Sequence, residues 1–423
     1  MQRRTFIALA AGLVPVLAGT AACTSRGQTA SDTAVRFTWW GNAERRRATQ
    51  EVIELFLSKH PEVEVAGEPV DDSYWDRLAT TTAAGDAPDV ITLGGAYVAE
   101  YAGRGALLDL AEVSAQLSTD GVDEAIIANG QVDGVQYAMT TGVNALAAIV
   151  NADVLAAAGV EVPDGTWTWS EYLALAAEVS ERSPEGTYGT DAVLDHDTLD
   201  AFARQRGEAL YTAEGQLGLT AATVTDFLTL PLQMIEAGAA PSAARINELS
   251  AGPLEQNLVG TGQAGMSLQW SNLLTAYSVA SGADLRLVTL PHDEPENLGM
   301  WLQSSQYYGI YARSEYPVEA ATFINFVLTD PEATALVGVD RGVPTLASVR
   351  ERIAADLSGP DQAQTEYIDA LRTQPLETLT IGPTGSTAVG DITQRAISDV
   401  CFGRLGPEEA ADQWFSESEQ AIA

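Results

Sequence analysis

The sequence predicts an α/β protein of two lobes, each a mainly parallel sheet flanked by helices. Strand-like and helix-like segments alternate near the N-terminus, which is typical of parallel sheets with helices on both faces. The length points to more than one core, because about 400 residues remain after a predicted leader. The first thirty residues, the composition and the order of motifs then define the protein further.

Residues 1–22 read as a signal peptide. Arg3 and Arg4 precede an uncharged run of small and apolar residues that ends at Ala22. This run is short for a helix that crosses a bilayer of roughly 30 Å, and nothing later in the chain approaches its apolar length. Paired arginines also resemble a twin-arginine export signal, so the export route stays open between that route and general secretion.

Cys23 is a predicted lipidation site. It follows the small residues Thr20-Ala21-Ala22, which resembles a bacterial lipobox, although leucine is usual where Thr20 stands. Residues 23–33 are polar and small, as expected of a flexible tether that holds a domain off a membrane. We therefore expect an exported protein, lipid-anchored at the outer face of the cytoplasmic membrane, whereas the alternative is an ordinary signal peptide with an incidental cysteine.

The composition argues against several classes of partner. The chain has 58 acidic and 22 basic residues and a formal charge of −36, so nucleic acid and anionic headgroups are not expected ligands. Its two cysteines, Cys23 and Cys401, cannot form a disulfide framework if the first carries lipid. His60, His196 and His292 lack metal-ligand spacing, and we predict neither a metal nor a cofactor.

The first elements follow one another as strand, helix, strand, helix and strand. Residues 35–40 form a β-rich run, and apolar residues at helical spacing follow over 43–59. An alternating strand is expected over 63–70, a helix over 74–84 and a strand over 89–93. In such sheets ligands bind beyond the carboxyl ends of the strands, so the segments after these strands are the first candidates for a site.

Ordered motifs give the chain a specific resemblance. The sequences at 39–42, 56–63, 75–78, 85–90 and 103–110 occur in the order found in extracellular solute-binding proteins of the sugar type, which serve ABC importers. The resemblance continues at a crossing segment over 144–151, a helix start at 167–172 with Ser170 as expected N-cap, the stretch 262–266 and a helix over 316–330. It thus spans nearly the whole mature chain.

The resemblance implies a periplasmic-binding-protein-like fold of type II. Its two lobes are joined by hinge crossings and close on the ligand, and a permease then recognises the closed, loaded shape. The implied receptor is not an enzyme, works as a monomer and passes its solute to the permease subunits. The implied division assigns 34–143 and 298–340 to the N-terminal lobe, and 144–297 and 341–423 to the C-terminal lobe.

Candidate ligand-binding residues combine this resemblance with the chemistry of sugars. A pyranose has polar edges and C–H faces, so its site needs aromatic surfaces beside carboxylates, amides and arginine. Of the other tryptophans, Trp39 and Trp75 are expected in the core, and Trp167 and Trp169 are expected to brace a helix. The predicted ligand-binding residues are Trp40, Asn42, Glu44, Asp72, Tyr97, Asn144, Trp270, Asn272, Trp301, Gln306 and Arg341.

The sequence departs from the family pattern at two places. Gly94-Gly95-Ala96 stands before Tyr97 where relatives carry a hydrogen-bonding side chain, which leaves backbone contacts or room for a larger ligand. The spacing from Met266 to the next tryptophan differs from that in the family. Trp270 therefore aligns with the family's ligand-stacking tryptophan only to within about two residues. The pocket is therefore not expected to copy that of any relative.

Two alternative functions remain open beside that of a sugar receptor. An exported receptor for a polyamine or a peptide would share the fold, and the acidic composition suits a cationic solute. An exported glycoside hydrolase would also have aromatic side chains and paired carboxylates. The absence of a G-x-S-x-G motif and the order of the motifs favour the receptor.

Overall fold

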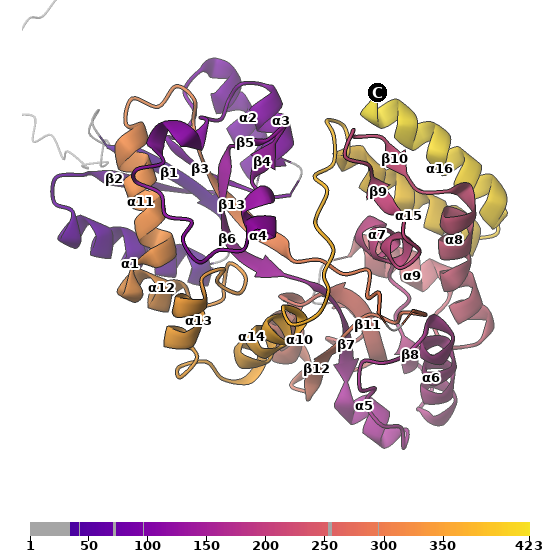
Figure 1. Ribbon diagram of the computed structural model, residues 1–423. Helices are drawn as coiled ribbons and strands as arrows, with labels where there is room; N and C mark the ends of the chain where they lie inside the picture. The colour runs from indigo at the N-terminus through magenta and orange to yellow at the C-terminus, as the bar shows by residue number, and fades with distance from the viewer. Residues whose placement is uncertain (1–33, 42, 71–72, 96, 253–255, 295) are drawn as a thin grey trace, which may run out of the picture.

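The computed structural model describes residues 34–41, 43–70, 73–95, 97–252, 256–294 and 296–423, which form two α/β lobes side by side (Figure 1). The predicted two-lobe fold is confirmed. The predicted signal peptide, Cys23 and the tether lie outside the described residues. No helix within the described ranges is both long and apolar enough to cross a membrane.

The first lobe is built on a five-stranded sheet in the order β2-β1-β3-β13-β6. β1 (Val35–Trp40) pairs in parallel with β2 (Val65–Val70) and with β3 (Val90–Leu93). β13 (Gln303–Ile310) returns from the second lobe and lies antiparallel between β3 and β6 (Ala138–Asn144). The carboxyl ends of β1, β2 and β3 therefore meet at one edge of the sheet.

Helices cover both faces of this sheet because its strands are apolar on both sides. On one face, Phe37, Trp39 and Tyr308 pack with the helices α1 (Ala43–Lys59) and α11 (Pro317–Thr329). On the other face, Ile91, Leu93 and Tyr307 pack with α2 and α3. The lobe is completed by α2 (Tyr74–Ala84), α3 (Tyr97–Gly103), a 3₁₀ turn (Leu110–Val113), α4 (Glu124–Ala128), the β4–β5 hairpin (Gln131–Val132 and Val135–Gln136) and α12 (Pro331–Val337).

The second lobe has a four-stranded sheet in the order β12-β7-β11-β8. β7 (Leu146–Asn151) is antiparallel to β11 (Ala264–Trp270) and to β12 (Leu285–Val288). Only β11 and β8 (Tyr188–Thr190) pair in parallel. The expectation of a mainly parallel sheet was thus wrong here, because β7 enters the sheet directly from the first lobe and its neighbours return against it. In the first lobe it holds for only two of the four strand pairs that the structure describes, because the returning β13 pairs antiparallel with both β3 and β6.

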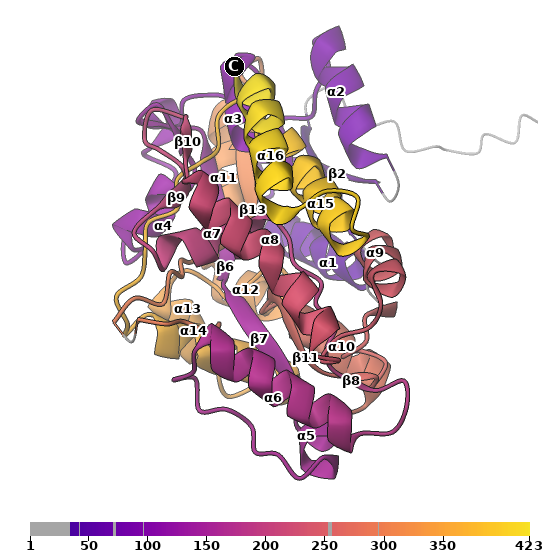
Figure 2. The ribbon, with the colours of Figure 1, turned by 90° about the vertical axis from the view of Figure 1, so that its right-hand side faces the viewer.

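Helices and one hairpin surround the second sheet (Figure 2). The C-terminal helices α15 and α16 pack against α8, and α14 packs against α10 and β12. The elements are α5 (Ala152–Ala157), α6 (Trp169–Arg182), α7 (His196–Arg204), β9 (Ala209–Tyr211), β10 (Leu217–Gly218), α8 (Ala221–Glu236), α9 (Ala243–Ala251), α10 (Leu273–Ser281), α14 (Gly359–Leu371), α15 (Thr387–Cys401) and α16 (Pro407–Ile422).

The lobes are joined where β6 passes into β7 with only Ala145 between them. Beside this crossing, the backbone of Val143 pairs with that of Val343, with N–O distances of 2.8 and 2.9 Å in the two directions. A Cβ on Gly142 would lie 2.5 Å from the carbonyl oxygen of Arg341, so only glycine permits this approach. Two chain segments are therefore locked together at the hinge.

After this pairing the chain stays near the first lobe for one more helix. α13 (Ala347–Ile353) packs on α12, whereas the next helix, α14, packs on the second sheet. These contacts associate 347–353 with the first lobe, whereas the predicted division placed everything from 341 in the second.

Local predictions from the sequence agree closely with the first elements. The helices over 43–59 and 74–84 are confirmed at both ends, and the first strand is confirmed over 35–40. The expected N-cap Ser170 was wrong: Thr168 caps α6 and forms a reciprocal capping box with Glu171. Trp39, Trp167 and Trp169 are buried as expected.

Candidate functional site

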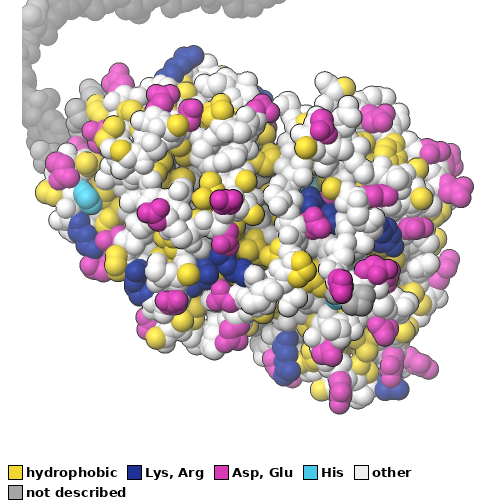
Figure 3. Space-filling model, viewed as in Figure 1, with side chains coloured by type: hydrophobic (Ala, Val, Ile, Leu, Met, Phe, Trp, Pro, Cys, Tyr) yellow, Lys and Arg dark blue, Asp and Glu magenta, His cyan; other side chains and the backbone are white. Residues whose placement is uncertain are grey.

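A cavity of about 980 Å³, partly open to solvent, lies between the two lobes. The first lobe contributes Gly95, just beyond β3, and Tyr307 of β13. The second lobe and the segments that join the lobes provide most of the wall: His196, Asp197, Asp200, Leu210, Tyr211, Trp301, Gln303, Leu379, Thr380, Ile381, Gly382, Ser386 and Thr387. A furrow between the lobes is visible in the space-filling view (Figure 3).

The start of α7 forms the polar part of the second-lobe wall. Asp195 caps this helix and accepts from the backbone N–H of Thr198, whose hydroxyl bonds back to the backbone of Asp195. The cap fixes the first turn, which places His196, Asp197 and Asp200 on the cavity. Local sequence chemistry thus positions three titratable side chains at one end of the site.

Each carboxylate of this wall has a hydrogen-bond donor of its own. The indole Nε1 of Trp270 donates to Oδ2 of Asp197 at 3.1 Å. Asp200 accepts from Nε of Arg204 at 3.0 Å and from the backbone N–H of Leu210 at 2.7 Å. Asp200 is therefore held by structural contacts, whereas in the described part of the chain Asp197 accepts from the neutral indole and has His196 Nε2 at 3.6 Å.

Burial sets the electrostatics of this end of the cavity. It raises the pKa of Asp197 to about 6, and the neighbouring His196 opposes that rise. Burial opposes protonation of His196, but the carboxylates of Asp197 and Asp195 raise its pKa. None of the lining residues that the structure describes is a lysine or an arginine. The wall is therefore suited to a neutral or cationic ligand more than to an anionic one.

Aromatic side chains gather at the edge where the first-lobe strands end. Trp40, at the end of β1, lies 4.9 Å from Tyr74 and 5.1 Å from Trp75 between ring centres. Trp75 stacks on Tyr97 at 3.7 Å with an angle of 4° between their planes. Trp75 was expected in the core, but it is only partly buried and belongs to this surface cluster.

Five of the predicted site residues lie in two groups near the cavity. Trp270 and Trp301 meet edge to face with ring centres 6.1 Å apart, and Asn144 on β6 lies opposite Gln303 on β13. Trp40 and Tyr97 belong to the aromatic cluster of the first lobe, and a Cβ on Gly94, the neighbour of Gly95, would lie 3.8 Å from the Trp40 ring. Of the predicted residues that the structure describes, Trp301 alone lines the cavity, and it is 2% exposed.

Other predicted residues lie elsewhere. Arg341 is buried in the first lobe, where it donates to the Thr49 hydroxyl of α1, and it lines a different cavity. Gln306 is buried within β13. Glu44 and Asn272 are exposed at the starts of α1 and α10. Asn42 and Asp72 lie outside the described residues.

Several residues that line the interlobe cavity were not predicted from the sequence. His196 was set aside because no second histidine or cysteine stands at ligand spacing, although the Asp195 cap signal marks it as the first residue of a helix. The segment Leu379 to Ser386 is rich in glycine, proline and threonine, which predicts a loop but not its position along the cavity. It runs along the second lobe between α14 and α15 in Figure 1.

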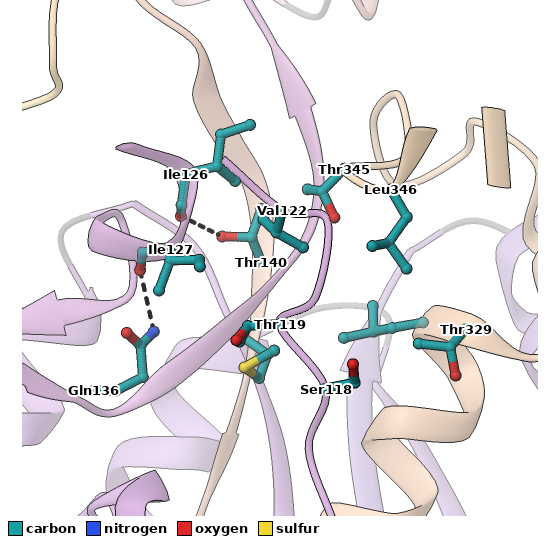
Figure 4. Close-up of a pocket in the computed structure, with 12 residues that line it drawn as sticks. Ser118, Thr119, Val122, Ile126, Ile127, Gln136, Thr140, Thr329, Thr345 and Leu346 are labelled. Atoms are coloured by element: carbon teal, nitrogen blue, oxygen red, sulfur yellow. Dashed lines mark hydrogen bonds between the residues drawn. The ribbon is translucent and has the colours of Figure 1, made fainter. Parts of the chain in front are cut away.

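A second cavity of about 370 Å³ lies within the first lobe and has a different character (Figure 4). Its wall is mainly apolar, with Val122, Ile126 and Leu346 among the lining side chains. Gln136 Nε2 donates to the Ile127 carbonyl at 3.2 Å, and the Thr140 hydroxyl donates to that of Ile126 at 3.3 Å. These groups bond to the backbone of their own lobe, so this cavity lacks the arrangement of an interlobe solute site.

Comparison with known families agrees with this geometry. The family model described as bacterial extracellular solute-binding protein matches residues 51–363, and the chain belongs to this family. It is therefore an extracellular solute-binding protein of the ABC-importer type. The sequence-based assignment to this group is confirmed.

Solved structures share the fold over almost the whole chain. A family 1 extracellular solute-binding protein from Alicyclobacillus acidocaldarius has a TM-score of 0.73 at 24% identity, covering 92% of this chain and 98% of that one. A periplasmic solute-binding protein from Pectobacterium atrosepticum has 0.82 at 20%, covering 92% and 100%. A periplasmic oligogalacturonide-binding protein from Yersinia enterocolitica, in complex with saturated digalacturonic acid, has 0.79 at 22%, covering 92% and 98%.

Proposed function

We propose that this receptor captures an uncharged mono- or oligosaccharide between its lobes and delivers it to the permease of an ABC importer by hinge closure. The observation that carries the proposal is the interlobe cavity, where aromatic rings of Tyr211, Trp301 and Tyr307 stand beside Asp197 and Gln303. Aromatic rings suit the C–H faces of a sugar, and carboxylate and amide groups suit its hydroxyls.

The charge of the interlobe cavity wall narrows the class of sugar that the receptor is expected to bind. The related protein from Yersinia enterocolitica binds an acidic sugar, saturated digalacturonic acid. Here the described wall offers the carboxylates of Asp197 and Asp200 and no basic side chain, which disfavours a uronic acid. A polyamine is the second candidate because, among the residues that the structure describes, His196 is the one cationic partner of Asp197. Asp200 is paired with Arg204, so a polyamine would meet only one free carboxylate.

Catalysis is not part of the proposal. A glycoside hydrolase needs two carboxyl groups that can act on opposite sides of a glycosidic bond. Of the two carboxyl groups in this wall, Asp200 is held by Arg204 and by the N–H of Leu210. The mature protein is therefore expected to release its solute unchanged. That it acts as a monomer is a separate expectation, which rests on the family resemblance.

Calorimetric titration tests the solute class. The same protein sample would be titrated in turn with neutral oligosaccharides, uronic acid oligosaccharides, spermidine and short peptides. Chromatography would then check each sugar for cleavage. Binding of a neutral sugar without cleavage is the expected result. Binding of spermidine alone would replace the sugar with a polyamine, and released sugar products would make the protein an enzyme.

The lipid anchor is a separate proposal that rests on Cys23 and the small residues before it. In the native host, the full chain should partition into the detergent phase of a Triton X-114 extract, and Cys23→Ala should move it to the aqueous phase. An unchanged partition would mean that the protein is secreted without a lipid.

A further inference from the structure

A third cavity, of about 330 Å³, lies on the other face of the first-lobe sheet from the interlobe site. It is lined by Thr141, Tyr308, Thr334 and Arg341, with apolar side chains of α11 and α12 around them. It shares no lining residue with the interlobe cavity. The interior has room for little more than one small ion or water molecule.

Arg341 brings a buried positive charge to this cavity. Arg341 is 3% exposed, and its Nη2 donates to the hydroxyl of Thr49. Its guanidinium carbon lies 5.4 Å from the centre of the Tyr308 ring. The other terminal nitrogen, Nη1, is buried and has no hydrogen-bond partner in the described part of the chain.

No carboxylate compensates this charge among the residues that the structure describes. Asp340, the residue before Arg341, pairs instead with Arg45 at 2.7 Å. Burial, with the nearby Arg45, lowers the pKa of Arg341 to about 9, which leaves the guanidinium protonated at neutral pH. A second cation is close, because Arg352 Nη1 lies 3.4 Å from the Thr334 hydroxyl.

Tyr308 adds a second unused donor. Its hydroxyl is buried without a partner in the described residues, and the residue is 1% exposed. The hydroxyls of Thr141 and Thr334 already donate to backbone carbonyls. Leaving a buried donor unpaired lowers the stability of the folded protein, and leaving a buried charge unpaired lowers it more. A water molecule would satisfy the donors, but only an anion would also balance the charge.

We propose that this cavity is a binding site for one small inorganic anion of the size of chloride, held by Nη1 of Arg341 and the hydroxyl of Tyr308. The site lies where the Arg341–Gly342 backbone contacts Gly142, next to the Val143–Val343 pairing. A bound anion therefore stabilises the hinge crossing from behind the sheet. The anion and the solute would bind in separate cavities, because these share no lining residue.

Thermal unfolding at constant ionic strength tests the site in solution. Replacing sodium gluconate, whose anion is too large for the cavity, by sodium chloride or bromide should raise the melting temperature of the wild-type protein. Arg341→Met should abolish this dependence, and Tyr308→Phe should raise the chloride concentration at half effect roughly tenfold. Arg286→Met, which removes an exposed arginine, should keep the wild-type response.

A crystal grown in bromide gives a readout that does not depend on stability. An anomalous peak between Arg341 and Tyr308 in the wild type, and a weaker peak in Tyr308→Phe at the same bromide concentration, is the expected result. Equal melting temperatures in gluconate and chloride, or a cavity without anomalous signal, would overturn the proposal. If Arg341→Met does not fold, the wild-type peak and the Tyr308→Phe response decide the question by themselves.

Discussion

Tyr307 and Tyr308 are consecutive residues of β13, and their rings lie on opposite faces of the first-lobe sheet. Tyr307 lines the interlobe cavity, whereas Tyr308 lines the cavity that holds Arg341. Successive side chains of a strand alternate between the two faces of a sheet, so β13 contributes lining residues to both cavities. The hydroxyl of Tyr308 is unpaired, as is that of Tyr211 across the interlobe cavity, among the residues that the structure describes.

The hydroxyl of Tyr211 is expected to bond to the solute. It is buried, lies close to the Ser386 side chain without a hydrogen bond of good geometry in the described part of the chain, and Tyr211 lines the interlobe cavity. Tyr211→Phe should therefore weaken solute binding by about 1 kcal/mol, roughly fivefold, without reducing the stability of the free protein. Titration calorimetry and urea unfolding measure the two effects. Tyr188→Phe, on a strand away from the cavity, should change neither; an equal loss of affinity in both variants would contradict this role.

The two glycines after β3 are expected to differ in their tolerance of a side chain. Gly95 lines the interlobe cavity with φ of +24°, a conformation that strains any L side chain, and the Cβ of an alanine there would meet no protein atom within 4 Å and would project into the space proposed for the solute. Gly94 has ordinary φ, and a Cβ there would make ordinary contact with Trp75 at 3.6 Å.

Gly95→Ala should therefore lower solute affinity severalfold, whereas Gly94→Ala should bind as the wild type does. Calorimetric titration of both variants, each checked for folding by circular dichroism, measures the difference. Equal affinities would mean that the solute does not approach the end of β3.

The sequence predicted the first lobe well because its signals are local. Helical periodicity and Gly85 fix the ends of α2, and strand alternation fixes β1. The same reasoning could not give strand directions in the second sheet. These depend on β7 entering from β6, a relation between segments that no local pattern encodes.

The candidate site was predicted only in part, for a similar reason. Trp301 was found because tryptophans near strand junctions are few. Arg341 was also selected near a junction, but its side chain turns into the first lobe toward Thr49, so the structure separates it from the interlobe cavity. No local sequence pattern marks Asp197 and Tyr211 as site residues. They become site residues because α7 and β9 pack together at the cavity.

The hinge crossing should not tolerate a side chain at Gly142. A Cβ would lie 2.5 Å from the Arg341 carbonyl oxygen and 2.6 Å from that of Gly342, and both belong to the backbone of the crossing. The Val143–Val343 hydrogen bonds of 2.8 and 2.9 Å hold this backbone in place. Gly142→Ala should therefore destabilise the protein by about 1–3 kcal/mol.

Urea unfolding compares this variant with Gly103→Ala. Gly103 ends α3 with ordinary φ, and a Cβ there would meet no atom within 4 Å, so alanine should be neutral or slightly stabilising. Hydrogen exchange of the Val143 amide should accelerate in Gly142→Ala alone. Wild-type stability and exchange in that variant would show that the crossing adjusts without cost.

Stability should rise as the pH falls from 7.5 to 5. Asp191 is buried, where it accepts from Ser267 at 2.5 Å and from Asn257 at 2.9 Å, and burial raises its pKa to about 6. The folded protein therefore holds a proton between pH 4 and 6 that the unfolded chain, with a carboxyl pKa near 3.9, has released. Protonation thus favours folding in this window, and the raised pKa of Asp197 acts in the same direction.

The resulting gain on acidification is on the order of 1–3 kcal/mol, measured as the free energy of unfolding in urea from pH 7.5 to 5. Asp191→Asn, which is always uncharged, should reduce this slope, whereas Asp86→Asn, at an exposed position, should not. Below pH 4 the trend should reverse, because groups such as Glu171, whose pKa is lowered by the hydrogen bonds of Thr168, lose their charge. Stability that increases from pH 5 to 7.5 would mean that Asp191 is ionised in the folded protein throughout, with its hydrogen bonds outweighing its burial.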